Sequence, residues 1–115
     1  MTKQEVRITT KIIRELSLFM MIHEYTDFQI ALNVTDDETL FTITLDHASD
    51  AFLNKMTEKI SRERELEVET YGWELVGDID SKSELEILGL LIDTIKIEKN
   101  NKTVISLIRK NRYKK

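Results

Sequence analysis

Residues 28–45, FQIALNVTDDETLFTITL, contain two runs in which apolar and polar side chains alternate, separated by a polar stretch at 35–38. The apolar positions are Phe28, Ile30, Leu32 and Val34 before that stretch and Phe41, Ile43 and Leu45 after it. A period of two places such residues on one face of a strand, and Thr-Asp-Asp-Glu is typical of a turn. The stretch therefore predicts a β-hairpin with one buried face.

Helical spacing replaces the alternation on both sides of this hairpin. Apolar residues share one side of a predicted helix from about residue 10 to 25, and a second helix runs to about residue 64 with Ser49 or Asp50 as its cap. A capping-box spacing at residues 81–84 precedes a third helix. Its shared side holds Leu85, Leu88, Leu91, Ile92 and Ile95, and residues 96–108 predict a second hairpin with its turn at 99–102. Alternation at residues 5–9 predicts a short edge strand.

Helices segregated from hairpins predict a two-layer α/β (α+β) sandwich, with the helices packed on one face of a mixed, largely antiparallel sheet. No repeat or linker interrupts the pattern, so we expect one domain over residues 1–109 followed by a basic tail at 110–115. Residues 66–80 are weakly periodic, and both a strand and a loose lid remain open for them.

Composition excludes several kinds of site. The 115 residues include no Cys and two His, so we expect no disulfide, no metal site and no bound cofactor. Five of the 17 basic residues lie in the last seven positions, Arg109, Lys110, Arg112, Lys114 and Lys115, leaving a body with a net charge of −9. An acidic body argues against nucleic acid as a partner. The absence of a signal-peptide core or a long apolar run predicts a cytoplasmic protein with no membrane contact.

Nucleophilic catalysis has few candidate residues in this sequence. His23 lies on the predicted inner side of the first helix, where a core histidine is the simpler interpretation than a general base. Residues 46–50, DHASD, are either a cation site or a strand-to-helix turn, and the turn explains the same letters. Neither a Walker A loop nor a G-x-G-x-x-G loop is present.

The first predicted helix carries apolar residues on a second side, which are Leu18, Met21, Ile22 and Tyr25. A surface helix of a two-layer domain needs only one apolar stripe. The second side therefore meets either a local cover such as residues 66–80 or a partner, which is a second copy or another regulatory protein. Trp73 is a further candidate contact residue, with core-edge cover as its alternative.

This order of elements resembles the ATP-binding fold shared by histidine kinases, gyrase-type ATPases and bacterial anti-sigma factor serine kinases. Residues 14–23, RELSLFMMIH, are similar to the family's N-box, in which Glu is followed four positions later by Asn and then by His. The first hairpin ends where the family's D-x-G-x-G begins, residues 88–93 resemble the helix start after the lid, and residues 102–104 resemble the final-strand G-T-x-V. The resemblance covers roughly residues 10–109 and implies a vestigial nucleotide pocket formed by Glu15, Phe19, Asp46, Gly89 and Thr103.

The chain departs from the family's pattern at the groups that perform its chemistry. Phe19 stands in place of the magnesium-holding Asn, and Ala48 and Asp50 stand in place of both glycines. A Cβ and a negative charge there oppose the approach of a triphosphate. On the helical wheel Leu18, Phe19 and Ile22 share the sector of Glu15, so the pocket is expected to be filled by apolar side chains.

Two functions follow from this pattern. The first is a non-catalytic regulatory module, anti-sigma-factor-like, that has lost nucleotide binding and binds a regulatory protein or a second copy through the first helix. The alternative is an ATP-binding serine-protein kinase of the anti-sigma type that retains weak nucleotide binding. A third reading, nucleic acid bound by the basic tail, conflicts with the acidic body.

Overall fold

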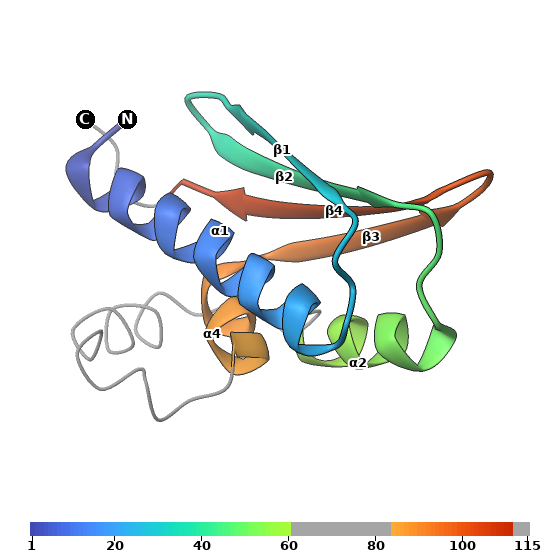
Figure 1. Ribbon diagram of the computed structural model, residues 1–115. Helices are drawn as coiled ribbons and strands as arrows, with labels where there is room; N and C mark the ends of the chain where they lie inside the picture. Colours follow the sequence, from blue (N-terminus) through green and yellow to red (C-terminus); the bar gives the residue numbers. More distant parts are fainter. Residues whose placement is uncertain (61–83, 112–115) are drawn as a thin grey trace.

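The sheet of the computed structural model consists of β1 (Gln29–Val34), β2 (Glu38–Leu45), β3 (Thr94–Lys99) and β4 (Thr103–Lys110) (Figure 1). The structure describes residues 1–60 and 84–111. The strands lie in the order β1-β2-β4-β3, and each neighbouring pair is antiparallel. Both predicted hairpins are present, and they join through β2 and β4, where Ile43 lies opposite Ile105.

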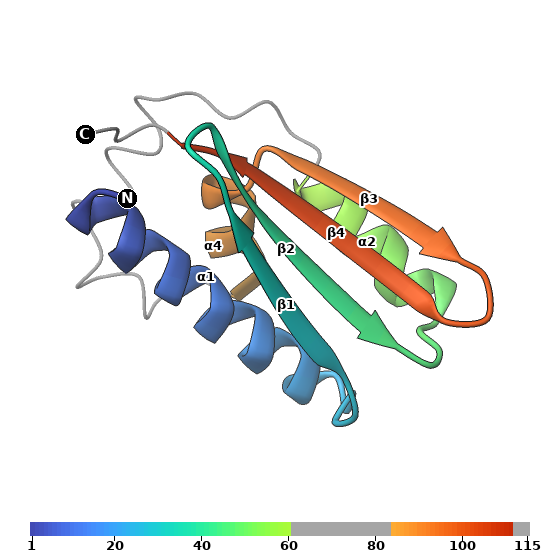
Figure 2. The same ribbon diagram turned by 90° about the horizontal axis from the view of Figure 1, so that it is seen from above.

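The helices α1 (Lys3–Ile22), α2 (Asp50–Ile60) and α4 (Glu84–Leu91) lie on the same face of this sheet (Figure 1). Seen from above, α1 lies at the β1 edge and α2 beneath β3 and β4 (Figure 2). The helix α4 contacts both α1 and α2. The chain is therefore a two-layer α+β sandwich with its helices on one face, as predicted. No helix in residues 1–60 or 84–111 has the length and apolar content to cross a membrane.

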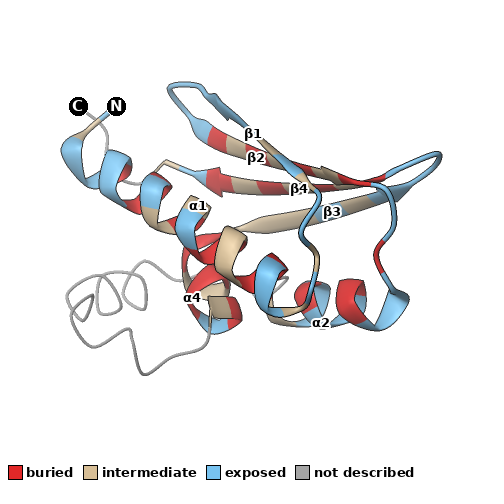
Figure 3. Ribbon diagram, viewed as in Figure 1, coloured by how far each residue is buried: buried red, intermediate tan, exposed pale blue. Residues whose placement is uncertain are grey.

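The core lies between the two layers, and each element contributes residues at its own period (Figure 3). Buried positions recur every three or four residues along α1 and at every second residue along β2 and β4. Examples are Ile8, Ile12, Leu16 and Met20 in α1, Phe41, Ile43 and Leu45 in β2, and Ile105 and Leu107 in β4. Each fully buried apolar side chain of this size contributes roughly 1.5–3 kcal/mol, so this shared core is the main stabilising feature of the fold.

The first helix begins earlier than predicted, and the edge strand expected at residues 5–9 is wrong. The N-cap residue is Thr2, whose Oγ1 accepts a hydrogen bond from the Glu5 backbone N–H at 3.2 Å. Glu5 and Ile8 are buried while Val6 is 46% exposed, which is helical and not alternating burial. The short alternation was part of a longer helical period.

The third helix is shorter than its apolar pattern predicted. Its last residue is Leu91, and Ile95 lies in β3 instead of on the helix. The strand pairing begins at once, because the Asp93 N–H donates to the Ile108 carbonyl oxygen at 2.9 Å. Three predictions fall wholly or partly outside the described residues. They are the extension of the second helix to residue 64, the segment 66–80, and residues 81–83 of the capping box at 81–84.

The first hairpin has a buried face on one strand only. Along β2, buried and half-buried residues alternate, and Phe41 is fully buried. In β1, by contrast, Leu32 is 46% and Val34 39% exposed, and most of the strand has the colour of exposed residues in Figure 3. The prediction of one buried face was wrong for β1, because this strand forms the sheet edge and the helices leave its face largely uncovered.

Candidate functional site

An aromatic cluster formed by Phe19, His23, Tyr25 and Phe52 lies where the end of α1 meets the start of α2. The Phe19 ring is 2% exposed and stacks on the Phe52 ring at a centroid distance of 5.0 Å. The His23 ring lies 4.5 Å from Phe19, and the Tyr25 ring lies 4.5 Å from Phe52. Aromatic pairs at these separations add about 0.5–1.5 kcal/mol beyond their buried area. Phe19, which the sequence resemblance places at the magnesium-holding Asn, therefore makes apolar contacts in this chain.

The end of α1 directs His23 and Tyr25 into this cluster. Glu24 has a φ of 68°, the left-handed conformation that ends many helices. The chain then turns back, so that the Tyr25 N–H donates to the Met20 carbonyl oxygen at 2.9 Å. Nδ1 of His23 lies 2.9 Å from the Phe19 carbonyl oxygen, to which it donates. His23 is half-buried, with a local hydrogen bond and two ring contacts, so it lies at the edge of the core.

Tyr25 also fixes the loop that leads into α2. Its Oη accepts a hydrogen bond from the Ser49 backbone N–H at 3.0 Å, and Ser49 Oγ accepts from the Phe52 N–H at 3.2 Å. Ser49 is therefore the α2 cap, as its residue type predicted. Ala48 between strand and helix is fully buried. In residues 1–60 and 84–111, no group of three or more His, Asp or Glu side chains could hold a metal ion.

The other residues that the resemblance assigns to a vestigial nucleotide pocket have partners of different kinds. The Glu15 carboxylate is buried, and its Oε1 contacts Lys11 Nζ at 2.9 Å and Arg14 Nη1 at 3.0 Å, all within α1. The Asp46 side chain is 85% exposed and lies 3.8 Å from Lys102 Nζ. Thr103 is buried and pairs with Leu45, the neighbour of Asp46. The structure thus brings Asp46 and Thr103 to one end of the sheet, whereas the ion pairs of Glu15 belong to α1.

Gly89 has a packing role in α4. A Cβ at this position would lie 2.8 Å from the carbonyl oxygen of Lys59 in α2. A contact that short requires the backbone to shift, so only glycine permits this approach of the two helices. The glycine that resembles part of the family's nucleotide-binding segment therefore serves helix packing here.

The predicted second side of α1 is partly exposed. Met21 is 56% and Ile22 59% exposed, while Leu18 is half-buried. Tyr25, assigned to the same surface, packs on Phe52 and is half-buried. Trp73 lies outside the described residues.

Comparison of the chain with protein-family models, curated proteins and solved structures finds no match.

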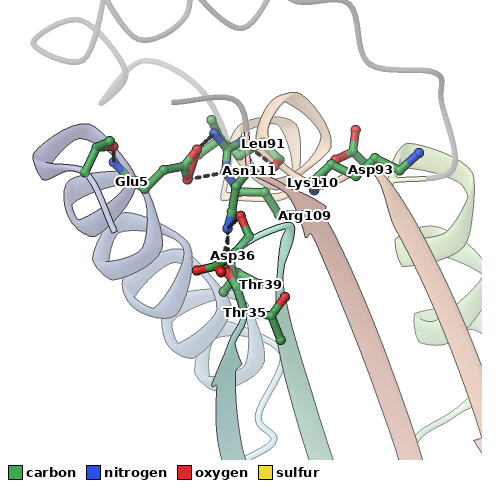
Figure 4. A network of polar contacts seen from close by, with 10 residues as sticks. Glu5, Thr35, Asp36, Thr39, Leu91, Asp93, Arg109, Lys110 and Asn111 are labelled. Carbon is green, nitrogen blue, oxygen red and sulfur yellow. Dashed lines mark hydrogen bonds and ion pairs between the residues drawn. The ribbon is translucent and has the colours of Figure 1, made fainter. Parts of the chain in front are cut away.

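A buried ion pair that the sequence analysis missed joins α1 to β4 (Figure 4). Arg109 is fully buried, with Nη2 2.8 Å from Glu5 Oε1 and Nε 3.0 Å from Glu5 Oε2. Its Nη1 donates to the Leu91 carbonyl oxygen at 3.0 Å, at the end of α4. The charge count set Arg109 apart from the acidic body together with the basic residues of the tail, whereas the residue lies on the inward face of β4. The signal was present, since Arg109 alternates in phase with buried Ile105 and Leu107.

Asn111 connects the end of β4 to the turn between β1 and β2 (Figure 4). Its backbone N–H donates to the Asp37 carbonyl oxygen at 2.9 Å. Its Nδ2 donates to the Thr35 carbonyl oxygen, and its Oδ1 accepts from Thr39 Oγ1, both at 3.0 Å. The side-chain amide therefore satisfies turn groups that would otherwise need water. The hydrogen bonds of Asn111 and the Arg109–Glu5 ion pair are structural contacts at one end of the molecule.

Proposed function

We propose that the chain is a non-catalytic protein-interaction module on a degenerate histidine kinase-like ATPase scaffold, with a regulatory role similar to that of anti-sigma factors. The observation that carries this proposal is the packing of Phe19 against Phe52 and His23. Magnesium requires oxygen ligands, and a phenyl ring supplies none. Without the ion that bridges the phosphates, phosphoryl transfer from ATP loses its main electrostatic support.

The surroundings of Glu15 support the loss of catalysis. In the family's N-box this carboxylate acts beside bound ATP, whereas here its Oε1 is held by Lys11 and Arg14. The two ion pairs keep the carboxylate against its own helix, at contacts of 2.9 Å to Lys11 Nζ and 3.0 Å to Arg14 Nη1. Gly89 adds a second argument, since its lack of a side chain is used by the Lys59 carbonyl oxygen of α2.

The arrangement of elements supports the proposed scaffold. The order α1, β1–β2 hairpin, α2, α4, β3–β4 hairpin is the one on which the family resemblance rests. Because the same fold carries many functions, this likeness supports a scaffold and not an activity.

The exposed end of α1 supports a protein partner. Met21 and Ile22 are more than half exposed at adjacent positions, and Leu18 lies one turn before them. Adjacent exposed apolar side chains are typical of interaction surfaces. A regulatory protein or a second copy of the chain would cover them. The buried position of Arg109 removes one cation from the tail, which further weakens a role for nucleic acid.

Titration calorimetry with ATP and magnesium tests the proposed loss of nucleotide binding. We expect no saturable heat up to millimolar ATP, because the metal ligand is replaced and the aromatic rings occupy its position. A dissociation constant on the order of micromolar would instead favour the alternative, a serine-protein kinase that retains its nucleotide site.

A control variant shows whether the ring itself blocks the site. Phe19→Asn restores the amide of the family's pattern, and Ile22→Asn places the same amide on the exposed side of α1. If wild type and both variants bind ATP equally, the proposed role of Phe19 in excluding nucleotide is wrong.

A further inference from the structure

The strand β1 is an edge strand of the sheet that residues 1–60 and 84–111 form. It lies at one end of the order β1-β2-β4-β3, and no other described strand pairs with its outer side (Figure 2). It pairs with β2 residue for residue from Gln29 to Val34, without a bulge that would interrupt its edge. A regular edge strand presents backbone donors and acceptors to any further strand.

The turn fixes which backbone groups point outward. The Thr35 N–H donates to the Glu38 carbonyl oxygen at 2.9 Å, so these two residues form a hydrogen-bonded pair. Such pairs alternate with non-hydrogen-bonded pairs along an antiparallel ladder. The N–H and C=O groups of Ile30, Leu32 and Val34 therefore point away from β2, toward the open side.

The side chains of the same residues form an incomplete apolar face. Leu32 lies opposite Phe41 and Val34 opposite Thr39, so they share the face that carries the core. Phe41 and Thr39 are fully buried, whereas Leu32 is 46% and Val34 39% exposed. An added strand with apolar residues at alternate positions would bury this face and pair the backbone in the same step.

The opposite edge of the sheet is protected in a way that β1 is not. The edge strand β3 carries Lys96, Glu98 and Lys99, and α2 contacts it. Charged side chains on an edge strand oppose pairing with another chain. All six residues of β1, QIALNV, are uncharged.

Charge at the two ends of β1 indicates the kind of strand that fits. Asp27 precedes the strand by two residues and Asp36 follows it by two, and both are exposed. A second copy would pair antiparallel about Leu32, with Ile30 opposite Val34, and would bring the acidic end of one strand next to the acidic end of the other. Like charges brought together repel each other, so self-pairing is disfavoured. Basic residues at both ends of the incoming strand would be stabilised instead.

We propose that β1 binds an extended peptide segment of a partner protein, with apolar residues at alternate positions and Lys or Arg at both ends, as an added strand of the sheet. This surface is separate from the exposed end of α1. The proposal does not depend on the loss of nucleotide binding.

Fluorescence anisotropy with the synthetic peptide KRVTVTVRK tests the proposal on the full chain. We expect saturable binding and at least about tenfold weaker binding of EEVTVTVEE. The variant Leu32→Pro removes an outward N–H that does not bond to β2. It should lower the affinity for the basic peptide KRVTVTVRK at least about tenfold. Val6→Thr removes an exposed apolar group near the start of α1, outside both proposed binding surfaces, and should leave the affinity for the peptide unchanged.

Charge reversal provides an independent test if Leu32→Pro does not fold. The double variant Asp27→Lys/Asp36→Lys should bind EEVTVTVEE more tightly than KRVTVTVRK, which reverses the preference of the wild type. The proposal fails if neither peptide binds, or if both bind wild type and variants equally. It also fails if the chain dimerises through this edge, which would appear as a doubled mass that Leu32→Pro abolishes.

Discussion

Phe19 is the buried ring between His23 and Phe52 in the aromatic cluster. It is 2% exposed and contacts the rings of His23 and Phe52. Phe19→Asn should lower the free energy of unfolding by about 1–3 kcal/mol, because an amide without partners replaces a buried ring. Urea denaturation measures this change. Ile22→Asn, at a 59% exposed position of the same helix, is expected to stay within about 0.5 kcal/mol of wild type. Equal losses in both variants would contradict the packing described for Phe19.

Thr9 is a polar residue in the buried stripe of α1. It is 4% exposed, and among the described residues its Oγ1 has no hydrogen-bond partner. Thr9→Val keeps the side-chain shape and removes the unsatisfied hydroxyl, so it should raise the free energy of unfolding by about 1 kcal/mol.

Thr10 is the matched control for this change. Its hydroxyl is exposed and donates to the Val6 and Arg7 carbonyl oxygens at 3.1 and 3.0 Å. Thr10→Val should therefore not raise the midpoint temperature of thermal unfolding. A stabilisation common to both variants would indicate helix propensity and not relief of the buried hydroxyl.

At the scale of elements, α1, α4 and β4 meet at the Arg109 guanidinium. Replacing Arg109 by Met leaves the Glu5 carboxylate buried without its cation and the Leu91 carbonyl oxygen without this donor. We expect a loss of about 3–5 kcal/mol, measured by chemical denaturation. Lys96→Met on the exposed part of β3 should change stability little.

A double variant separates the ion pair from the packing of the two side chains. Glu5→Met combined with Arg109→Met removes both charges, so it should recover part of the loss seen with Arg109→Met alone. If the double variant is less stable than the single one by the full cost of Glu5→Met, the two side chains are not coupled.

The elements also show where sequence patterns succeed and where they fail. The hairpin at residues 28–45 was predicted because its alternation is strict and its turn is polar. The edge strand at residues 5–9 was wrong because five residues do not separate a period of two from one of 3.6. The exposure of β1 could not be predicted, since alternation shows which residues share a face but not whether a helix covers that face.

Only part of the candidate site could be predicted from the sequence. The presence of Phe19 where the resemblance expects Asn is visible in the sequence, but its contact with Phe52 depends on how α1 meets α2. Glu5 and Arg109 are in phase with the apolar stripes of their elements, and that phase was the available signal for a buried pair. Their pairing across the fold became visible only in the tertiary structure.

For the whole molecule, the open question of partners is tied to the exposed end of α1. If a second copy covers Met21 and Ile22, then Met21→Glu or Ile22→Glu should convert an oligomer into a monomer, because the charge would be buried at the interface. Light scattering measures the mass. A mass that is the same for wild type and both variants would exclude self-association through this surface.

The bond between Glu5 and Arg109 spans 104 positions of the chain. During translation at about 5–20 residues per second, Glu5 is synthesised about 5–20 s before Arg109. Throughout that interval the Glu5 carboxylate in the first helix cannot pair with Arg109, so it stays in contact with water. The buried ion pair between α1 and β4 can form only after β4 has been synthesised.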